Sequence, residues 1–386
     1  PQKDAIQKTA RRLVEALRNK RLTGGVDGLI HEYSLSSQEG IALMCLAEAL
    51  LRIPDKASRD SLIRDKISKG DWQSHLSSDS LFVNAATWGL MITGKLVATN
   101  SEKGMSSALS RMLSKGGEPL VRQGVDRAMR LMGEHFVCGQ TISNALTNSR
   151  KMINKGFNYS YDMLGEAAMT DEDALKYYAA YEQAIHAIGK SSPGLGIYEG
   201  PGISIKLSAL HARYSRAQYD TVMNELYPRL RDLSLLAHQY DIGINIDAEE
   251  ADRLEISLDL LERLCHEPEL ASWNGIGFVI QAYQKRSPFV IDYVIDLARR
   301  TKRRIMVRLV KGAYWDTEIK RAQTDGLEGY PVYTRKVHTD VCYLACARKL
   351  LEEPEYVFPQ FATHNAHTVA AIYHMAGSNY YKGQYE

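Results

Sequence analysis

From residue 157 onward, stretches with the period-two pattern of β-strands alternate strictly with the amphipathic patterns of α-helices. Such alternation predicts an α/β fold with parallel strands joined by crossover helices, because a tight turn cannot connect two parallel neighbours. The predicted strands cover residues 157–164, 202–208, 242–247, 275–283, 304–311 and 357–364. The predicted helices cover residues 173–189, 216–238, 252–265, 288–300, 333–352 and 368–375.

The spacing of these units narrows the fold further. One unit recurs about every 40 residues, which favours a (βα)8 barrel of the TIM type over a doubly wound sheet. Six units do not close such a barrel, and Gln384-Tyr385-Glu386 has the pattern of a seventh strand that begins where the sequence ends. We therefore predict that residues 153–386 form a TIM-type barrel domain, incomplete at its C-terminus and truncated before the last units.

Residues 1–152 contain helical patterns almost throughout, which predicts a helical arm and an all-helical domain ahead of the barrel.

The 48 Lys and Arg residues of the whole chain nearly balance the 46 Asp and Glu residues, and the net charge of +2 argues against DNA binding by this segment. No apolar run reaches the roughly 20 residues of a membrane span. The five cysteines lie mostly inside helical patterns, which predicts reduced thiols and a cytoplasmic location.

The fifth predicted strand and the residues after it combine several ligand-binding groups. Arg308 is a cation on an otherwise apolar strand. The strand ends at Lys311-Gly312, where a second cation precedes a position with no side chain to block the approach of a ligand. Tyr314-Trp315 then offer flat surfaces for stacking. This combination predicts a site for an anionic, partly aromatic ligand, such as a phosphate-bearing cofactor.

Polar side chains occur late on every predicted strand, mostly in the phase opposite to the aliphatic one. In a TIM-type barrel the carboxyl ends of the strands meet at one face, where the chemistry takes place. We therefore expect these side chains to ring one mouth of the barrel. They are Asp162 and Glu166, then Ser204, Lys206 and Ser208, then Asn245 and Asp247, then Gln281 and Tyr283, then Arg308 and Lys311, and finally Thr363, His364 and Asn365.

Simpler interpretations exist for several of these residues. Lys206 and Asp247 could form a structural ion pair, and Arg308 could merely neutralise Asp247, because a buried charge needs a partner in any case. Hydrogen bonding explains His364 more simply than metal binding does, since cations already match the nearby carboxylates. The sequence therefore predicts no metal site.

Two further functions remain open on the residues alone. A lysine inside a barrel strand, here Lys206, is a natural nucleophile toward a carbonyl, so a Schiff-base aldolase is an alternative enzyme class. A non-catalytic scaffold, whose helical domain contacts protein or DNA, is the alternative outside enzymes.

No G-x-G-x-x-G or Walker-type motif accompanies a strand, so a bound nucleotide would rest on barrel loops. Arg308, Lys311, Thr334 and Lys336 would then surround its phosphates.

Four segments at the predicted strand ends have a distinctive sequence. They are Gly202-Ile-Ser-Ile-Lys-Leu-Ser208, Asn245-Ile-Asp-Ala-Glu-Glu250, Arg308-Leu-Val-Lys-Gly-Ala-Tyr-Trp315 and Phe361-Ala-Thr-His-Asn365. Together with Gly117-Glu-Pro-Leu in the helical segment, they resemble the proline dehydrogenase domain of bacterial proline utilization A, a family of bifunctional proline catabolic flavoenzymes. The resemblance implies FAD-dependent oxidation of L-proline to Δ1-pyrroline-5-carboxylate on a distorted (βα)8 barrel, with hydride transfer from proline C5 to flavin N5.

The resemblance also implies roles for individual residues. The residues expected to be catalytic are Arg308, Lys206, Asp247 and Tyr314. The residues expected in the proline pocket are Lys206, Asp247, Leu309 and Tyr314, with Glu166 ordering its rim. The residues expected to contact FAD are Gln281, Arg308, Val310, Lys311, Gly312, Ala313, Trp315, Thr334, Lys336, Thr363, His364 and Asn365.

The same resemblance implies partners. L-proline is the expected substrate, and membrane quinone is the expected electron acceptor for a cytoplasmic protein that contacts the membrane surface peripherally. Full-length members carry a downstream glutamate-semialdehyde dehydrogenase module, which this sequence does not contain. The family's further tyrosine and paired arginine, which hold the proline carboxylate, would lie past Glu386.

Overall fold

The computed structural model describes residues 2–19, 137–192 and 194–386, together with isolated positions between residues 53 and 133. The chain divides into two compact units, Pro1–Arg18 with Ser149–Glu386, and Asn19–Asn148. Most of the second unit lies outside the described residues, as do the helices predicted there and the Gly117-Glu-Pro-Leu segment. The sheet belongs to the first unit.

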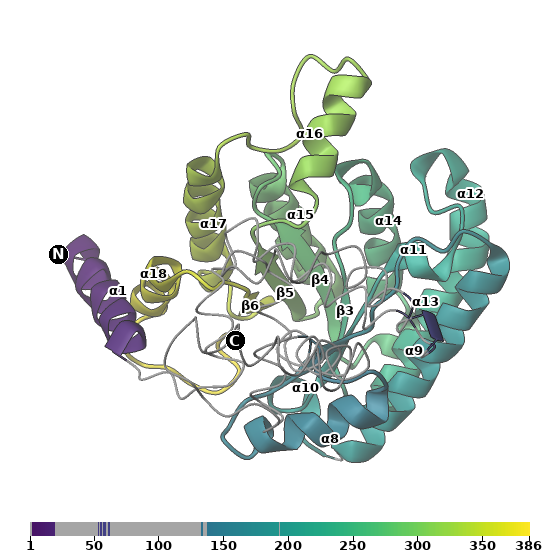
Figure 1. The fold of residues 1–386 in the computed structure, drawn as a ribbon, viewed down its shortest axis with the longest axis horizontal. Coiled ribbons are helices and arrows are strands. Elements are labelled where there is room, and N and C mark those ends of the chain that lie inside the picture. Colours follow the sequence, from purple (N-terminus) through teal and green to yellow (C-terminus); the bar gives the residue numbers. More distant parts are fainter. Residues whose placement is uncertain are drawn as a thin grey trace, which may run out of the picture. The chain divides into compact units, whose positions relative to one another are not determined.

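A parallel sheet of six strands, curled into a half-barrel, forms the centre of the first unit (Figure 1). Its strands lie in sequence order: β1 (Ser160–Asp162), β2 (Gly202–Ile205), β3 (Ile244–Ile246), β4 (Ile276–Gln281), β5 (Ile305–Val310) and β6 (Val357–Phe361). Each strand pairs in parallel with the next one along the chain. All six lie within the predicted stretches, so the predicted positions, order and direction of the strands are confirmed.

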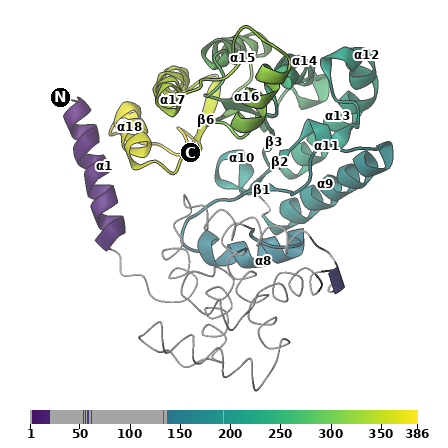
Figure 2. The same ribbon diagram turned by 45° about the horizontal axis from the view of Figure 1, so that its top comes forward.

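Crossover helices stand along the outer side of the sheet (Figures 1 and 2). They are α9 (Asp171–Ser191), α13 (Tyr227–Tyr240), α14 (Leu254–Cys265), α15 (Ser287–Thr301) and α17 (Lys336–Leu351), and α18 (Ala366–Ala376) follows β6. On α9, Tyr181, Ile185 and Ile188 recur at intervals of three to four residues and are buried. Such stripes pack on the aliphatic phase of the strands, which leaves the other phase for polar groups.

Short-range signals in the sequence explain where two of these helices begin. Thr170 caps α9: its side-chain oxygen accepts a hydrogen bond from Asp173 N at 3.1 Å, and the Asp173 carboxylate accepts one from Thr170 N at 3.1 Å. Pro288 occupies the first turn of α15, where its missing N–H removes no intrahelical bond. Each signal ends a loop that starts at the carboxyl end of a strand, and so limits the length of that loop.

The helices α10 (Gly196–Glu199) and α16 (Trp315–Thr324) lie outside the predicted elements, and α11 (Leu207–Leu210) overlaps the end of the second predicted strand. The prediction that Ser208 continues the polar phase of the second strand is therefore wrong. The strand ends at Ile205 because the chain turns at Lys206 into α11. Ser208 instead supports the loops: its N–H donates to the buried Glu249 carboxylate at 3.0 Å, and its Oγ accepts from Ala167 N at 3.0 Å.

Two helices that precede the sheet in sequence are bonded to later elements. In α1 (Gln2–Asn19), Thr9 Oγ1 lies 2.9 Å from His374 Nε2 of α18. In α8 (Ile142–Ile153), Ser149 Oγ lies 2.8 Å from the Tyr161 hydroxyl of β1. No helix among the described residues is both long enough and apolar enough to cross a lipid bilayer.

The last residue of the sequence extends the sheet beyond β6. Glu386 N donates to Pro359 O at 2.9 Å, and Phe361 N donates to Glu386 O at 2.7 Å. Hydrogen bonds that join one residue to both neighbours of Gln360 in this way are typical of parallel strand pairing. This pairing supports the prediction that a seventh strand begins here.

Candidate active site

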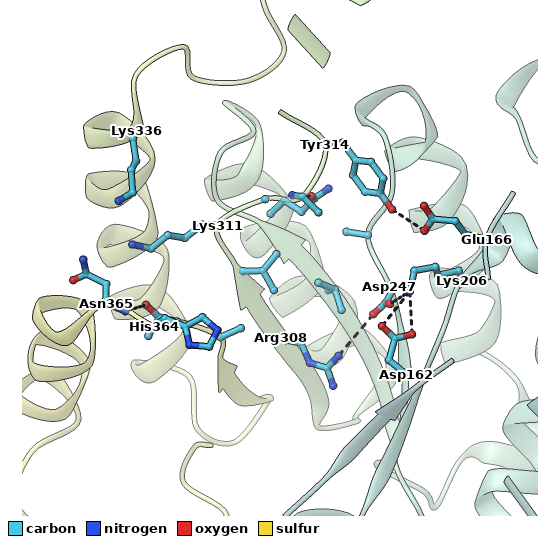
Figure 3. A pocket seen from close by; sticks show the side chains of 18 of the residues that line it. Asp162, Glu166, Lys206, Asp247, Arg308, Lys311, Tyr314, Lys336, His364 and Asn365 are labelled. Atoms are coloured by element: carbon cyan, nitrogen blue, oxygen red, sulfur yellow. Dashed lines mark hydrogen bonds and ion pairs between the residues drawn. The ribbon is translucent and has the colours of Figure 1, made fainter. Parts of the chain in front are cut away.

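A cavity of about 930 Å³ opens at the carboxyl ends of the strands (Figure 3). In parallel-sheet folds this face is where ligands bind. The residues that line the cavity are Asp162, Leu164, Glu166, Lys206, Asp247, Ala248, Val279, Gln281, Arg308, Val310, Lys311, Gly312, Ala313, Tyr314, Lys336, Ala362, Thr363, His364 and Asn365. The structure therefore brings together most of the late-strand polar groups that the sequence predicted to converge.

Lys206 lies at the centre of a charged cluster on one side of the cavity (Figure 3). Its Nζ donates to Asp247 Oδ2 at 2.9 Å, to Asp162 Oδ1 at 3.0 Å and to Asp162 Oδ2 at 3.2 Å. Its backbone N–H donates to the Tyr181 hydroxyl of α9 at 3.1 Å, at the turn between β2 and α11. The Lys206 side chain is only 15% exposed, so the two carboxylates compensate for the hydration that the ammonium group loses.

Arg308 joins this cluster from β5. Its Nη1 donates to Ser204 Oγ at 2.6 Å and its Nη2 donates to Ser160 Oγ at 2.7 Å, while Nη1 lies 3.7 Å from Asp247 Oδ1. The partners come from β2, from β1 and from the end of β3, so the half-barrel curvature of the sheet is what brings them within reach. The guanidinium plane is therefore fixed before a ligand enters.

The cluster shifts the pKa of two of its members. Burial alone would lower the pKa of Lys206, but the carboxylates of Asp247 and Asp162 outweigh burial and hold that pKa above the usual lysine value. Burial raises the pKa of Asp247; Lys206 opposes that shift and the charge of Asp162 adds to it. Lys206 is thus a permanent cation at neutral pH.

Tyr314 and Glu166 border the same side of the cavity (Figure 3). The Tyr314 hydroxyl donates to Glu166 Oε2 at 3.3 Å. Burial, together with the charge of Glu166, raises the pKa of Tyr314, so its phenol stays protonated and can donate a hydrogen bond. Glu166 reaches this position from the loop after β1, and Tyr314 from the loop after β5.

The wall between the two sides of the cavity is uncharged and closely packed. Gln281, at the end of β4, has both ends of its amide bonded: Nε2 donates to Glu249 O at 2.8 Å, and Oε1 accepts from Ala313 N at 3.1 Å. Gly312 has a φ of +142°, and a Cβ at this position would lie 2.4 Å from the Tyr283 ring. The position therefore requires glycine.

Replacing Gly312 with alanine is expected to destabilise the protein by about 3 kcal/mol. The new methyl group would collide with the buried Tyr283 ring, and residues other than glycine rarely adopt the backbone conformation of this position. Thermal unfolding of the full-length protein, followed by circular dichroism, measures the effect. Gly329→Ala is the matched control, since nothing lies within 4 Å of a Cβ at Gly329. Equal melting temperatures for the two variants would contradict the steric argument.

A second group of cations lies on the opposite side of the cavity (Figure 3). Lys311 Nζ donates to Asp340 Oδ1 at 2.6 Å, and Lys336 Nζ donates to Oδ1 and Oδ2 of the same carboxylate at 3.0 Å and 2.7 Å. Although burial opposes it, these two lysines hold the pKa of Asp340 below its usual value. Asp340 belongs to α17, which begins at Lys336, so both ammonium groups are held near one point of the cavity edge.

The loop after β6 completes this side of the cavity with Thr363, His364 and Asn365. Asn365 caps α18, because its Oδ1 accepts from Thr368 N at 3.0 Å, and its own N–H donates to Thr363 Oγ1 at 3.1 Å. His364 and Asn365 lie near Lys311 in Figure 3, at the N-terminal, positive end of α18. This side of the cavity therefore favours an anionic ligand group.

Three residues that were expected to contact ligands do not line the cavity: Leu309, Trp315 and Thr334. Leu309 is fully buried in the strand phase opposite to Arg308, and its expected place in the proline pocket stays a prediction. Trp315 is 42% exposed at the start of α16, where its Nε1 donates to Tyr333 O at 2.9 Å. That bond places the indole beside the segment that contains Thr334.

Two acidic residues contribute to the site although neither had been assigned to a ligand. Asp162 was recognised only as a polar group late on the first strand. Asp340 lies on a helix one turn after Lys336, so the only signal in the sequence was the i, i+4 spacing of opposite charges. Among the described residues, no group of three or more His, Cys, Asp or Glu side chains could hold a metal ion.

Comparisons with known proteins give relatives along the whole chain. It is 72% identical over 391 residues to the bifunctional protein PutA of Escherichia coli (strain K12), an alignment that covers 100% of this chain and 30% of that protein. It is 29% identical over 185 residues to proline dehydrogenase 1 of Bacillus subtilis (strain 168), covering 48% of this chain and 53% of that protein. A crystal structure of a Bradyrhizobium japonicum proline utilization A mutant matches with a TM-score of 0.74 and 47% identity, covering 100% of this chain and 38% of that one.

Two family models also match, in separate parts of the chain. The model described as the DNA-binding domain of proline dehydrogenase matches residues 25–136, almost all of which lie outside the described residues. That description gives no support to the expectation that the helical segment does not contact DNA. The model described as proline dehydrogenase matches residues 145–386, which include the sheet and every residue that lines the cavity. Because this match covers well over half of the sequence, the chain belongs to the proline dehydrogenase family.

Proposed function

We propose that this chain binds FAD and L-proline in the cavity and oxidises L-proline to Δ1-pyrroline-5-carboxylate. Family membership supports the reaction, and one observation carries the assignment of the site. The cavity has a pair of cations on each side, Lys206 with Arg308 and Lys311 with Lys336, and uncharged residues between the two pairs (Figure 3). A cofactor with a phosphate part and a reactive ring, beside a small carboxylate substrate, matches such a division of charge.

The residues present fit FAD in size and in chemistry. A cavity of about 930 Å³ lies within the range of cofactor and small-molecule sites. Lys311 and Lys336, with the groups from Thr363 to Asn365, would hold the phosphate and adenosine parts. Trp315 and Thr334 would border the same end from outside the cavity. Gln281 and Arg308 would contact the isoalloxazine ring, and the residues along the rest of the cofactor would be Val310, Gly312 and Ala313.

The cluster around Lys206 is proposed to hold L-proline. Lys206 would bind the substrate carboxylate, and Asp247 would balance the charge and orient both cations, as its contacts with Lys206 and Arg308 suggest. Tyr314 would close the pocket over the substrate, held in place by its hydrogen bond to Glu166. These residues orient proline and limit the access of water.

When bound, FAD would supply the two-electron acceptor for the hydride that leaves proline C5, while the lone pair of the deprotonated proline nitrogen would form the C=N bond of the product. Arg308 is proposed to stabilise the negative charge that develops near the flavin during this transfer. Its guanidinium is already fixed by Ser204, Ser160 and Asp247, so it needs no rearrangement in the reaction. This preorganisation is what makes an electrostatic contribution effective.

We also propose that residues 153–386 are part of a (βα)8 barrel of the TIM type and that the segment before them is a separate helical domain. Six parallel strands in sequence order, with the cavity at their carboxyl ends, support the barrel. The pairing of Glu386 with β6 supports a seventh strand at that edge. In a crystal structure of the full-length protein, a sheet that stays open at β6 would contradict this proposal.

The visible absorption spectrum of the full-length protein tests the proposed reaction. The purified protein is expected to show the flavin absorption band, and adding L-proline without oxygen is expected to bleach it, because the bound flavin becomes reduced. D-proline is a suitable control, since its carboxylate points the wrong way when its ring is superimposed on that of L-proline. A folded protein without flavin, or a spectrum that L-proline leaves unchanged, would refute the proposal.

The alternative of a Schiff-base aldolase is disfavoured by the surroundings of Lys206. An amine nucleophile must be uncharged, whereas Asp247 and Asp162 hold the pKa of Lys206 above its usual value. Borohydride reduction in the presence of simple aldehydes or ketones is therefore expected to give no adduct on Lys206. Mass spectrometry of the peptide that contains Lys206 checks this result, and a stable adduct there would restore the aldolase.

Family resemblance further supports three proposals about the whole protein. The first is that the electrons pass to membrane quinone. The second is that the protein is cytoplasmic and contacts the membrane surface peripherally. The third is that a glutamate-semialdehyde dehydrogenase module follows this chain in the full-length protein. The chain covers only 30% of the length of the PutA relative, whose name calls it bifunctional. Sedimentation of the reduced full-length protein with quinone-containing vesicles tests the membrane contact; protein that stays in the supernatant would exclude it.

A further inference from the structure

Glu249 is a buried carboxylate that lies behind the cavity wall. Its side chain is only 4% exposed, and it does not line the cavity. Oε1 accepts a hydrogen bond from Ser208 N at 3.0 Å, and Oε2 accepts one from Arg253 Nη1 at 3.0 Å. A buried charge is costly unless it is paired and hydrogen-bonded, so these two contacts are what keep Glu249 inside the protein. The proposed reaction makes no direct use of this carboxylate, so its burial has another reason.

The bond to Ser208 holds the turn that carries Lys206. Lys206 directly precedes α11, and Ser208 is the second residue of that helix. The N–H groups in the first turn of a helix have no acceptor within it, and Lys206, as the N-cap residue, has no side-chain acceptor to offer. The Glu249 carboxylate supplies that acceptor from the next loop. The backbone around Lys206 is thus held on two sides, by Tyr181 at its own N–H and by Glu249 two residues later.

Ser208 also fixes the loop after β1, which carries Glu166. Its Oγ accepts from Ala167 N at 3.0 Å, and its carbonyl oxygen accepts from Ala168 N at 2.9 Å. Ala167 has a φ of +53°, in the left-handed region that residues other than glycine seldom adopt. Such a conformation persists only where its surroundings hold it, and the two bonds from Ser208 do so here. Glu166 directly precedes this position, so the same bonds determine where it meets Tyr314.

The backbone of Glu249 makes a further connection. Its carbonyl oxygen accepts from Gln281 Nε2 at 2.8 Å, and Gln281 lines the cavity at the end of β4. Glu249 itself belongs to the loop after β3, and it contacts the loops after β1 and β2 through Ser208. It therefore joins the four segments that supply Glu166, Lys206, Asp247 and Gln281 to the cavity.

We propose that Glu249 is a positioning residue, which keeps the loops that carry Lys206 and Glu166 in the arrangement that binds L-proline. This inference rests on the proposed function. The carboxylate acts through Ser208 and does not reach the ligand. Its loss is therefore expected to weaken substrate binding more than it slows the reaction of bound substrate, because Arg308 and Gln281 are held by groups that remain.

Glu249→Gln tests the role of the carboxylate, because glutamine has the same size but only one acceptor oxygen. Either Ser208 N or Arg253 Nη1 must then face its NH2 group, donor against donor. In steady-state kinetics of the full-length protein with its cofactor, the KM for L-proline is expected to rise about tenfold and kcat to fall less than about threefold. Glu250→Gln is the matched control. Glu250 forms an ion pair with the same Arg253, at 3.3 Å, but within the described chain it is bonded to no residue of the loop after β2.

Hydrogen–deuterium exchange, read by mass spectrometry, tests the positioning without turnover. In Glu249→Gln the peptides that cover residues 164–169 and 206–210 are expected to exchange about tenfold faster, because both segments depend on the bond that fixes Ser208. Ser208→Ala keeps the N–H that Glu249 holds but loses the oxygen that holds Ala167. This variant is expected to affect residues 164–169 alone.

Unchanged exchange in both segments of Glu249→Gln would overturn the proposal. Equal effects in Glu250→Gln would do the same, as would a loss confined to kcat with an unchanged KM. An increase in exchange spread over the whole chain would also count against it, since it would mark a general loss of stability. Failure of the full-length protein to oxidise L-proline would count only against the proposed function, because exchange does not depend on turnover.

Discussion

Replacing Lys206 with methionine is expected to lower kcat/KM for L-proline by about a thousandfold, equivalent to about 4 kcal/mol. The substitution removes the cation proposed to bind the substrate carboxylate. It also leaves Asp162 and Asp247, both now bonded to Lys206, free to repel that carboxylate. Because this interaction exists before and during the reaction, the loss is expected mainly as an increase in KM.

Steady-state kinetics of the full-length protein over a wide range of L-proline concentration measures this split between KM and kcat. Lys349→Met is the matched control, since Lys349 forms an ion pair with Asp292 between two helices on the outer side of the sheet. Flavin content and melting temperature establish that each variant is folded. A Lys206→Met enzyme with an unchanged KM would show that the substrate carboxylate binds elsewhere.

Much of the fold follows from the sequence because its signals are periodic. The change from helical periodicity to alternating strands and helices predicted all six strands, and the phase of β5 separated Arg308 from buried Leu309. The same reasoning placed Lys206 and Asp247 at one face, which the structure confirms with a 2.9 Å contact.

The remaining features depend on contacts that periodicity does not report. A strand of three residues, β1, carries too little pattern to show that Asp162 points at Lys206. Asp340 acts through its position on α17, where an ion pair with Lys336 is indistinguishable in sequence from an ordinary surface pair. The early end of β2 at Ile205 follows from the turn into α11, which no propensity signal marks. Local sequence thus predicts the place of the cavity, whereas the partners that orient its cations are visible only in the folded structure.

Replacing Arg308 with methionine is expected to lower the midpoint potential of the bound flavin by about 30 to 60 mV. This shift corresponds to the roughly 1.5 to 3 kcal/mol of one hydrogen bond to a charged group in a two-electron couple. The guanidinium is proposed to favour the reduced, more negative flavin, so its loss makes reduction harder. Reduction by L-proline is expected to slow about a hundredfold, because the same charge develops in the transition state.

Spectroelectrochemistry gives the potential, and anaerobic stopped-flow absorbance gives the reduction rate, both on the full-length protein. Arg299→Met is the control, because Arg299 lies on α15 and pairs with Glu353 in the loop after α17, so this variant removes the same charge at a distance from the cavity. The two readouts distinguish two roles for Arg308, contact with the flavin and contact with the substrate carboxylate. Its position beside Asp247 is compatible with either role. A lowered potential with little change in substrate binding assigns it to the flavin. An unchanged potential with a weakened affinity for L-proline would assign it to the substrate carboxylate, alongside Lys206.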